Sequence, residues 1–230
     1  MNAPATESAQ VRASARRRRA RRGVAALEAV IVLPLMVFII IGGVEMYLYT
    51  RVMAVMDRVA FTLANSISIQ TSLTDDSNCT SPDHICTYGV LVPTLLMPLA
   101  PKNAAVIISV YATNTPFNGG PPSAWTNISS PNHGWTKIVY QGASAATPTS
   151  QISAATLPTS IISRNLQTAD TVIVVEVFYK YQPFAFSGAF FKLFFNPQQY
   201  SRALIRPRYA DLCRLINPAN PAPANSICGS

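Results

Sequence analysis

Residues 24–44 read VAALEAVIVLPLMVFIIIGGV, a continuous apolar run with a single charged side chain. As a helix with a rise of about 1.5 Å per residue, the run is about 31 Å long. This length matches the roughly 30 Å hydrocarbon core of a bilayer. A buried helix of a soluble protein is the alternative, but such helices seldom present apolar side chains on every face over this length. The run therefore predicts a helix that spans or inserts into a membrane.

Arginines crowd the N-terminal side of this run. The segment 1–23 holds seven of the chain's basic side chains and one acid, so it carries +6 of the net charge of +8. Basic residues beside a spanning helix stay in the cytoplasm, so we expect the N-terminus inside and the rest of the chain outside. Nucleic-acid binding is not expected, because the basic segment has neither aromatic residues nor apolar periodicity.

A secretory signal peptide is the competing explanation. It predicts an apolar stretch of at most about 15 residues, followed by an A-x-A-like cleavage site. Here the stretch is longer, and the segment 42–60, GGVEMYLYTRVMAVMDRVA, contains no such site at the expected place. Twin-arginine export is not expected either, because the arginines are not followed by the hydrophobic pattern of that signal.

Glu28 is the single charge of the apolar run. A carboxylate within a spanning helix costs roughly 2.5 to 3.5 kcal/mol on insertion scales, so it calls for a functional reason. It lies about 6 Å along the helix axis from Val24, close to the cytoplasmic face. The plainer alternative is that its carboxylate reaches back to the lipid headgroups or to the nearby arginines.

Residues 21–35, RRGVAALEAVIVLPL, resemble the processing site of type IV prepilins and pseudopilins. In those proteins a membrane aspartic peptidase cuts after a Gly, and a Glu occupies the fifth mature position. The resemblance is closer to the TadE/TadG-like minor pseudopilins of tight-adherence (Flp) systems. The shared marks are the Gly-to-Glu spacing, Leu33-Pro34, Glu45 followed by Tyr47, and more weakly residues 171–181, TVIVVEVFYKY, and the Arg-Pro-Arg of residues 206–208.

The resemblance implies a minor pilin or pseudopilin that helps to assemble, initiate or anchor a pilus or a related secretion filament. It implies processing at Arg22, Gly23 and Val24, and an assembly role for Glu28 and Pro34. The implied partners are a prepilin peptidase, the major pilin, other minor pseudopilins, an inner-membrane assembly platform and membrane lipid. The implied location is the bacterial inner membrane, crossed once, with a periplasmic C-terminal domain, or an extracellular pilus.

A physical reason supports the role of Glu28. Cleavage after Gly23 would create a new α-amine at Val24, which is charged below roughly pH 8. In pilin-like assemblies the fifth-position Glu is thought to pair with this amine of a neighbouring subunit. Two buried charges that are each costly alone become tolerable as a pair, and the pairing sets the axial register between helices.

The chain beyond the membrane run predicts an α+β fold. Residues 48–67 repeat apolar side chains every three or four positions. We therefore expect one helix, with a membrane-embedded half and an amphipathic half, that reaches about residue 70. The amphipathic half should pack on a small antiparallel sheet with long loops. Pro34 predicts a local kink. The expected domains are a leader (1–23), this helix (24–70) and an exported α+β domain (71–230). Within the exported domain we expect strands at 106–112, 171–181 and 137–141, and helical stretches at 90–99 and 158–166.

All four cysteines lie on the expected exported side, where disulfides are the default. Four cysteines allow three pairings, and proximity in sequence favours Cys79 with Cys86 and Cys213 with Cys228. His84 lies near the first pair, but no fourth ligand stands at a recognisable spacing, so no metal is expected.

Enzyme motifs are not found in the sequence: there is no G-x-S-x-G and no Walker loop, and the chain has two histidines. We expect no catalytic residue and no cofactor.

Glu176 is the one exported acid in an apolar context, and most simply it faces solvent or pairs with Arg206 or Arg208. Residues 183–195, PFAFSGAFFKLFF, fit either core or a membrane or subunit contact. The alternative to a pilin is a single-pass anchored binding protein or adhesin with an uncleaved N-terminus.

Overall fold

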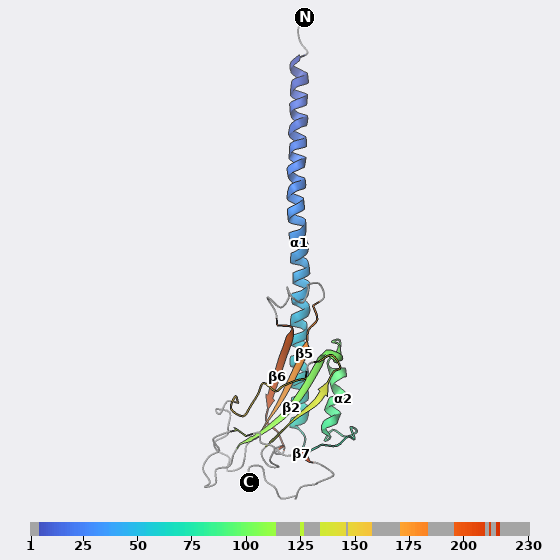
Figure 1. Cartoon of the computed structure of the whole chain (residues 1–230), viewed down its shortest axis with the longest axis vertical. Coiled ribbons are helices and arrows are strands. Elements are labelled where there is room, and N and C mark those ends of the chain that lie inside the picture. Colours follow the sequence, from blue (N-terminus) through green and yellow to red (C-terminus); the bar gives the residue numbers. More distant parts are fainter. Residues whose placement is uncertain are drawn as a thin grey trace. The chain divides into compact units, whose positions relative to one another are not determined.

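The computed structural model of the chain describes residues 5–113, 125–126, 134–145, 147–157, 171–183, 196–209, 212 and 215–216, with side chains from Glu28 onward. The chain divides into two compact units, Met1–Leu48 and Tyr49–Ser230. The first unit is helical. The second is an α+β domain built on an antiparallel sheet (Figure 1). The α+β fold predicted from the sequence is therefore confirmed.

Helix α1, Ala5–Ser68, belongs to the first unit up to Leu48 and to the second unit from Tyr49. Its C-terminal end lies close to the position predicted from the amphipathic pattern. Its N-terminal end differs from the expectation, because the helix begins inside the basic leader rather than at Val24. Pro34 lies inside the helix, which continues past it to Ser68. A proline in an apolar helix is tolerated where local adjustments satisfy the freed backbone groups.

The second unit contains seven described strands, which are β1 Leu73–Thr74, β2 Ala104–Thr113, β3 Trp125–Thr126, β4 Gly134–Gln141, β5 Thr171–Lys180, β6 Gln198–Ile205 and β7 Leu215–Ile216. The main sheet has the strand order β3-β2-β5-β6, and β4 also pairs with β2. Every pairing in this sheet is antiparallel. A separate short parallel pair joins β1 to β7.

The part of α1 that belongs to the second unit, residues 49–68, packs on one face of this sheet. Its apolar side chains at three- and four-residue spacings are buried, as an amphipathic helix requires. Polar contacts tie it to strand β6: Ser201 Oγ donates to Asp57 Oδ1 over 2.5 Å, and Gln199 Nε2 contacts the carbonyl of Tyr49 at 3.5 Å. The buried residues of this part are Val52, Met56, Val59, Ala60, Leu63, Ala64 and Ile67.

The residues that follow β4 cover the opposite face of the sheet. Tyr111 on β2 and Val172 on β5 are cross-strand partners there, and both pack against Ile152 and Leu157. The Tyr111 hydroxyl donates to the carbonyl of Ile152 over 2.8 Å. Strand β5 is consequently covered on both faces and is buried at every position before Lys180. A strand that is covered on both faces has a nearly continuous apolar sequence. For this reason the sequence predicts this strand.

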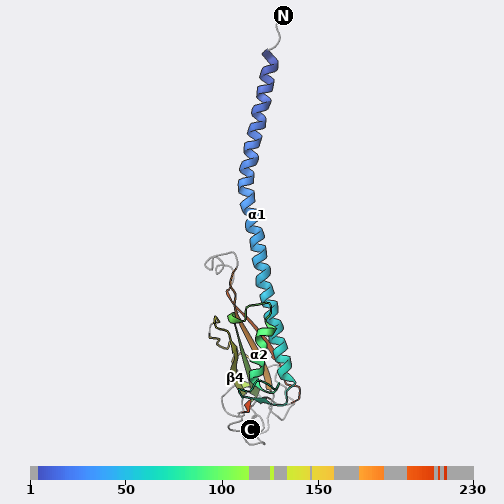
Figure 2. The ribbon, with the colours of Figure 1, turned by 90° about the vertical axis from the view of Figure 1, so that its right-hand side faces the viewer.

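Helix α2, Ile85–Leu95, lies beside β4, and the two ribbons run next to each other in Figure 2. The approach is close at Gly89, where an added Cβ would meet the carbonyl oxygen of Val139 at 2.2 Å. Only glycine fits this position without a backbone shift. Arg58 of α1 donates to the carbonyls of Leu95 and Met97, over 3.2 and 3.4 Å, and so ties the end of α2 to α1.

The strands expected at 106–112, 171–181 and 137–141 correspond to β2, β5 and β4. The expected helix at 90–99 is present, but it begins and ends about one turn earlier than expected, at Ile85 and Leu95. Strand β6 was missed, because its sequence QQYSRALI is half polar and lacks a run of β-branched residues. The helix expected at 158–166 and most of the phenylalanine-rich stretch 183–195 lie outside the described residues.

Candidate functional site

The first unit exposes an unusually continuous apolar surface. Ten large apolar side chains of α1 are between 45% and 72% exposed, and they point to every side of the helix. Soluble proteins rarely expose apolar patches of this extent unless a membrane or partner covers them. The ten residues are Val30, Ile31, Val32, Leu33, Leu35, Met36, Val37, Phe38, Ile39 and Ile40.

This surface belongs to the stretch Glu28–Ser68 of α1, which is 41 residues long. By length and composition, the stretch is able to cross a membrane. It needs only about 20 residues to do so. The remaining turns can therefore leave the bilayer as the same helix and enter the second unit, where their apolar side chains are buried.

The predicted processing site lies within α1. Arg22, Gly23 and Val24 are consecutive helical residues, and Glu28 follows Gly23 by five positions, a rise of about 7.5 Å. The Glu28 side chain is exposed. Pro34 lies in the same helix, at the apolar surface defined above. The structure thus places the five predicted processing and assembly residues on one continuous helix.

The Arg-Pro-Arg segment lies far from this site in sequence and has a structural role at the other end of α1. Arg208 Nη2 donates to Asn65 Oδ1 over 2.9 Å, and the Arg208 backbone N–H donates to the Ser68 carbonyl over 2.7 Å. The second contact satisfies a carbonyl in the last turn of α1, where helices leave such groups without an intrahelical partner. Arg208 therefore holds the strand that precedes it to the end of the helix.

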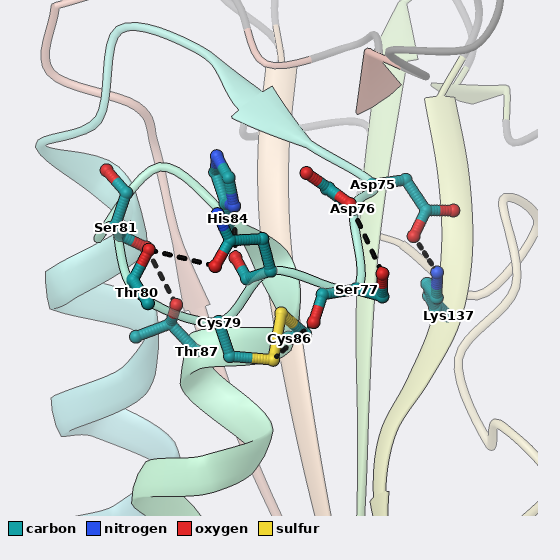
Figure 3. The surroundings of a disulfide bond; sticks show 11 residues. Asp75, Asp76, Ser77, Cys79, Thr80, Ser81, His84, Cys86, Thr87 and Lys137 are labelled. Carbon is teal, nitrogen blue, oxygen red and sulfur yellow. Dashed lines mark hydrogen bonds and ion pairs between the residues drawn. A yellow bond between two sulfur atoms is a disulfide. The ribbon is translucent and has the colours of Figure 1, made fainter.

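A disulfide joins Cys79 to Cys86, whose Cα atoms are 5.2 Å apart. This is the pairing that proximity in sequence favours. An ion pair between Asp75 and Lys137 of β4 ties the chain just before the bridge to the sheet (Figure 3). Cys213 and Cys228 lie outside the described residues, so the second expected pair stays a prediction.

Further contacts hold the loop that the bridge closes. Tyr88 donates its hydroxyl to the carbonyl of Pro82 over 2.8 Å. Burial raises the pKa of Tyr88 to about 12, so the hydroxyl keeps its proton at neutral pH. The hydroxyl of Ser81 bonds to the carboxylate of Asp83 and lowers the pKa of that acid.

Replacing both Cys79 and Cys86 by serine is expected to lower the free energy of unfolding by about 2.5 kcal/mol, because the bridge closes a short loop and limits the unfolded chain. Urea unfolding of the full chain in detergent measures this change. Wild-type protein unfolded in reductant is the matched comparison. If reductant lowers the stability further than the double variant does, Cys213 and Cys228 also form a bridge. An unchanged midpoint in the double variant would contradict the stabilising role of the first bridge.

Glu176 lies in a different environment from the one expected. Its side chain does not face solvent; it is fully buried at the centre of strand β5. The carboxylate accepts hydrogen bonds from the Gln151 backbone N–H over 2.8 Å, from the Tyr200 hydroxyl over 2.8 Å, and from the Ser150 hydroxyl. Its cross-strand neighbour on β6 is Arg202, rather than the expected Arg206 or Arg208.

These contacts give Glu176 a structural role: it fastens the segment around Gln151 to the face of the sheet. Burial, together with the hydrogen bond to Glu176, raises the pKa of the Tyr200 hydroxyl, which therefore stays protonated and donates. Sequence reasoning missed this network because its donors come from residues 24 to 26 positions away on either side. An acid in the middle of an apolar strand was the signal that could have pointed to it.

No family model matches this chain, and comparisons with curated proteins and with solved structures find no match either.

Proposed function

We propose that this chain is a minor pilin or pseudopilin of the tight-adherence type, anchored in the bacterial inner membrane by α1. In this proposal the N-terminus is cytoplasmic and the second unit is periplasmic. The subunit helps to initiate, assemble or anchor a pilus or a related secretion filament. It acts by assembly and not by catalysis.

The observation that carries the proposal is the position of Glu28. It is the one charged residue of the apolar run 24–44, two positions before the ten exposed apolar side chains, and it follows Gly23 by five positions on the same helix. An ionisable group in a spanning helix is costly and therefore signals function. A prepilin peptidase that cuts after Gly23 would create the α-amine that such an acid can pair with in a neighbouring subunit.

The second unit supports the proposal in a more general way. Residues 49–68 of α1 belong to this domain, and their buried apolar side chains complete its hydrophobic core. A pull on the helix would thus be transmitted to the domain through buried contacts. The proposed partners are the peptidase, the major pilin, other minor pseudopilins, the inner-membrane assembly platform and membrane lipid, and nucleic acid is not among them.

Intact mass spectrometry of the chain isolated from cells with an active prepilin peptidase tests the proposal. We expect a protein that begins at Val24 and has lost the whole leader, 1–23. Cells lacking the peptidase should yield the uncut chain, and a Gly23→Val variant should remain uncut in both. An intact arginine-rich leader in cells with active peptidase would contradict the proposal and favour an anchored binding protein or adhesin.

A further inference from the structure

Residues 75–80 read DDSNCT and precede the Cys79–Cys86 bridge. Asn78, Cys79 and Thr80 form an Asn-x-Thr tripeptide whose middle residue is not proline, which is the acceptor pattern for N-linked glycans. Asp76 stands two positions before the asparagine and places a carboxylate beside the tripeptide. The tripeptide alone is common by chance, and its surroundings decide whether a transferase can reach it.

The structure exposes the atoms that such a transfer needs. The side chains of Ser77, Asn78 and Thr80 are all exposed. Thr80 Oγ1 donates to Asn78 Oδ1 over 3.0 Å, so the hydroxyl and the amide of the tripeptide already face each other. Within the described part of the chain, Asn78 Nδ2 has no hydrogen-bond acceptor. The nitrogen that would form the new bond is therefore open to solvent.

The rest of the loop holds this asparagine outward. The ring of His84 contacts the carbonyl of Asn78 through Nδ1. The bridge follows at Cys79 (Figure 3). On the other side, Asp75 pairs with Lys137 of β4, and its backbone N–H donates to the carbonyl of Ile216 over 2.6 Å. The backbone of the loop is thus fastened at both ends, and the side chains of Ser77 and Asn78 between the fastenings are exposed.

We propose that Asn78 is an acceptor for an N-linked oligosaccharide. The donor is an oligosaccharide carried on a polyprenyl diphosphate in the membrane, and the catalyst is a bacterial oligosaccharyltransferase. The bond between C1 of the first sugar and the diphosphate oxygen breaks, and a bond from C1 to Asn78 Nδ2 forms. The amide loses one proton to the solvent, and the polyprenyl diphosphate leaves with the electron pair of the broken bond.

The proposal rests on the proposed function, because the donor and the active site of the transferase face the exported side of the membrane. The second unit faces that side if the arginine-rich N-terminus stays in the cytoplasm. The Cys79–Cys86 bridge is consistent with this compartment, since disulfides form and persist in the periplasm.

The chain contains its own control. Asn127, Ile128 and Ser129 form a second tripeptide of the acceptor type, but Trp125 stands where Asp76 stands in the first. Trypsin separates the two tripeptides, because cleavage after Arg58, Lys102 and Lys137 places Asn78 in the peptide 59–102 and Asn127 in the peptide 103–137. The mass of each peptide therefore reports one tripeptide.

The experiment incubates the purified full chain, oxidised and in detergent micelles, with a bacterial oligosaccharyltransferase and a polyprenyl-diphosphate-linked oligosaccharide. We expect the peptide 59–102 to gain the mass of one oligosaccharide and the peptide 103–137 to gain none. Asn78→Gln and Thr80→Ala should abolish the gain, Thr80→Ser should retain it, and Asp76→Ala should reduce it. Because these side chains lie in a surface loop, the variants should fold, and resistance of the thiols to alkylation confirms that the bridge has formed.

No gain on the peptide 59–102, or a gain that persists in Asn78→Gln, overturns the proposal. The same peptides from cells that carry the transferase test the proposed function separately. Transfer in micelles and in cells supports both the acceptor and its export. Transfer in micelles but not in cells supports Asn78 as an acceptor and contradicts the exported orientation of the second unit.

Discussion

A Glu28→Leu variant should insert into the membrane and be cut after Gly23 as the wild type is, but its incorporation into the filament should fall by more than about tenfold. Insertion improves, because a carboxylate costs roughly 2.5 to 3.5 kcal/mol within a spanning helix. Assembly fails, because the α-amine of the neighbouring subunit would remain in the hydrocarbon without its partner. Breaking a buried charge pair in this way costs about 3 to 5 kcal/mol, and about 1.4 kcal/mol corresponds to a factor of ten.

The measurement is the amount of the chain that co-purifies with sheared filaments or with the assembly platform, relative to the amount in the membrane. Ala29→Leu is the matched control, because it adds the same side chain at the next position of the exposed helix surface without removing a charge. Glu28→Gln separates charge from size, and we expect it to fail as Glu28→Leu does. Normal incorporation of Glu28→Leu would remove Glu28 from the mechanism, even if processing at Gly23 were observed.

A Glu176→Ala variant is expected to lose about 3 kcal/mol of the free energy of unfolding. The carboxylate is buried and accepts three hydrogen bonds, and bonds to a charged group contribute about 1.5 to 3 kcal/mol each. Its removal leaves the Tyr200 hydroxyl and the Gln151 N–H without their acceptor in the interior. The segment around Gln151 should then detach from the sheet before the sheet itself unfolds.

Urea unfolding of the full chain in detergent, followed by tryptophan fluorescence, measures this loss. Trp135 on β4 is a suitable reporter, because it is 9% exposed and its indole N–H donates to the Leu212 carbonyl over 3.0 Å. Glu176→Gln keeps an acceptor oxygen and should lose about 1 kcal/mol, as should Tyr200→Phe. A Glu176→Ala midpoint equal to that of the wild type would show that the network does not stabilise the fold.

The same two glutamates show how far the sequence alone reaches. Glu28 stands out because its neighbours in sequence are also its surroundings: on an exposed helix the residues within one or two turns define the environment. Glu176 also stands in an apolar run, yet its local sequence predicts solvent exposure or pairing with Arg206 or Arg208. Its surroundings are set by strand register, which brings Arg202 opposite to it, and by a segment that follows another strand.

Local patterns in the sequence determined the apolar helix of membrane-spanning length, the two central strands β2 and β5, and the pairing of Cys79 with Cys86. Each of these depends on residue types within a short window, where propensity, periodicity and proximity act directly. Tertiary structure alone decided strand β6, the burial of Glu176 and the contact of Arg208 with the end of α1. These depend on pairing between segments as many as 143 positions apart, for which the free energy comes from burial and hydrogen bonding in the assembled domain.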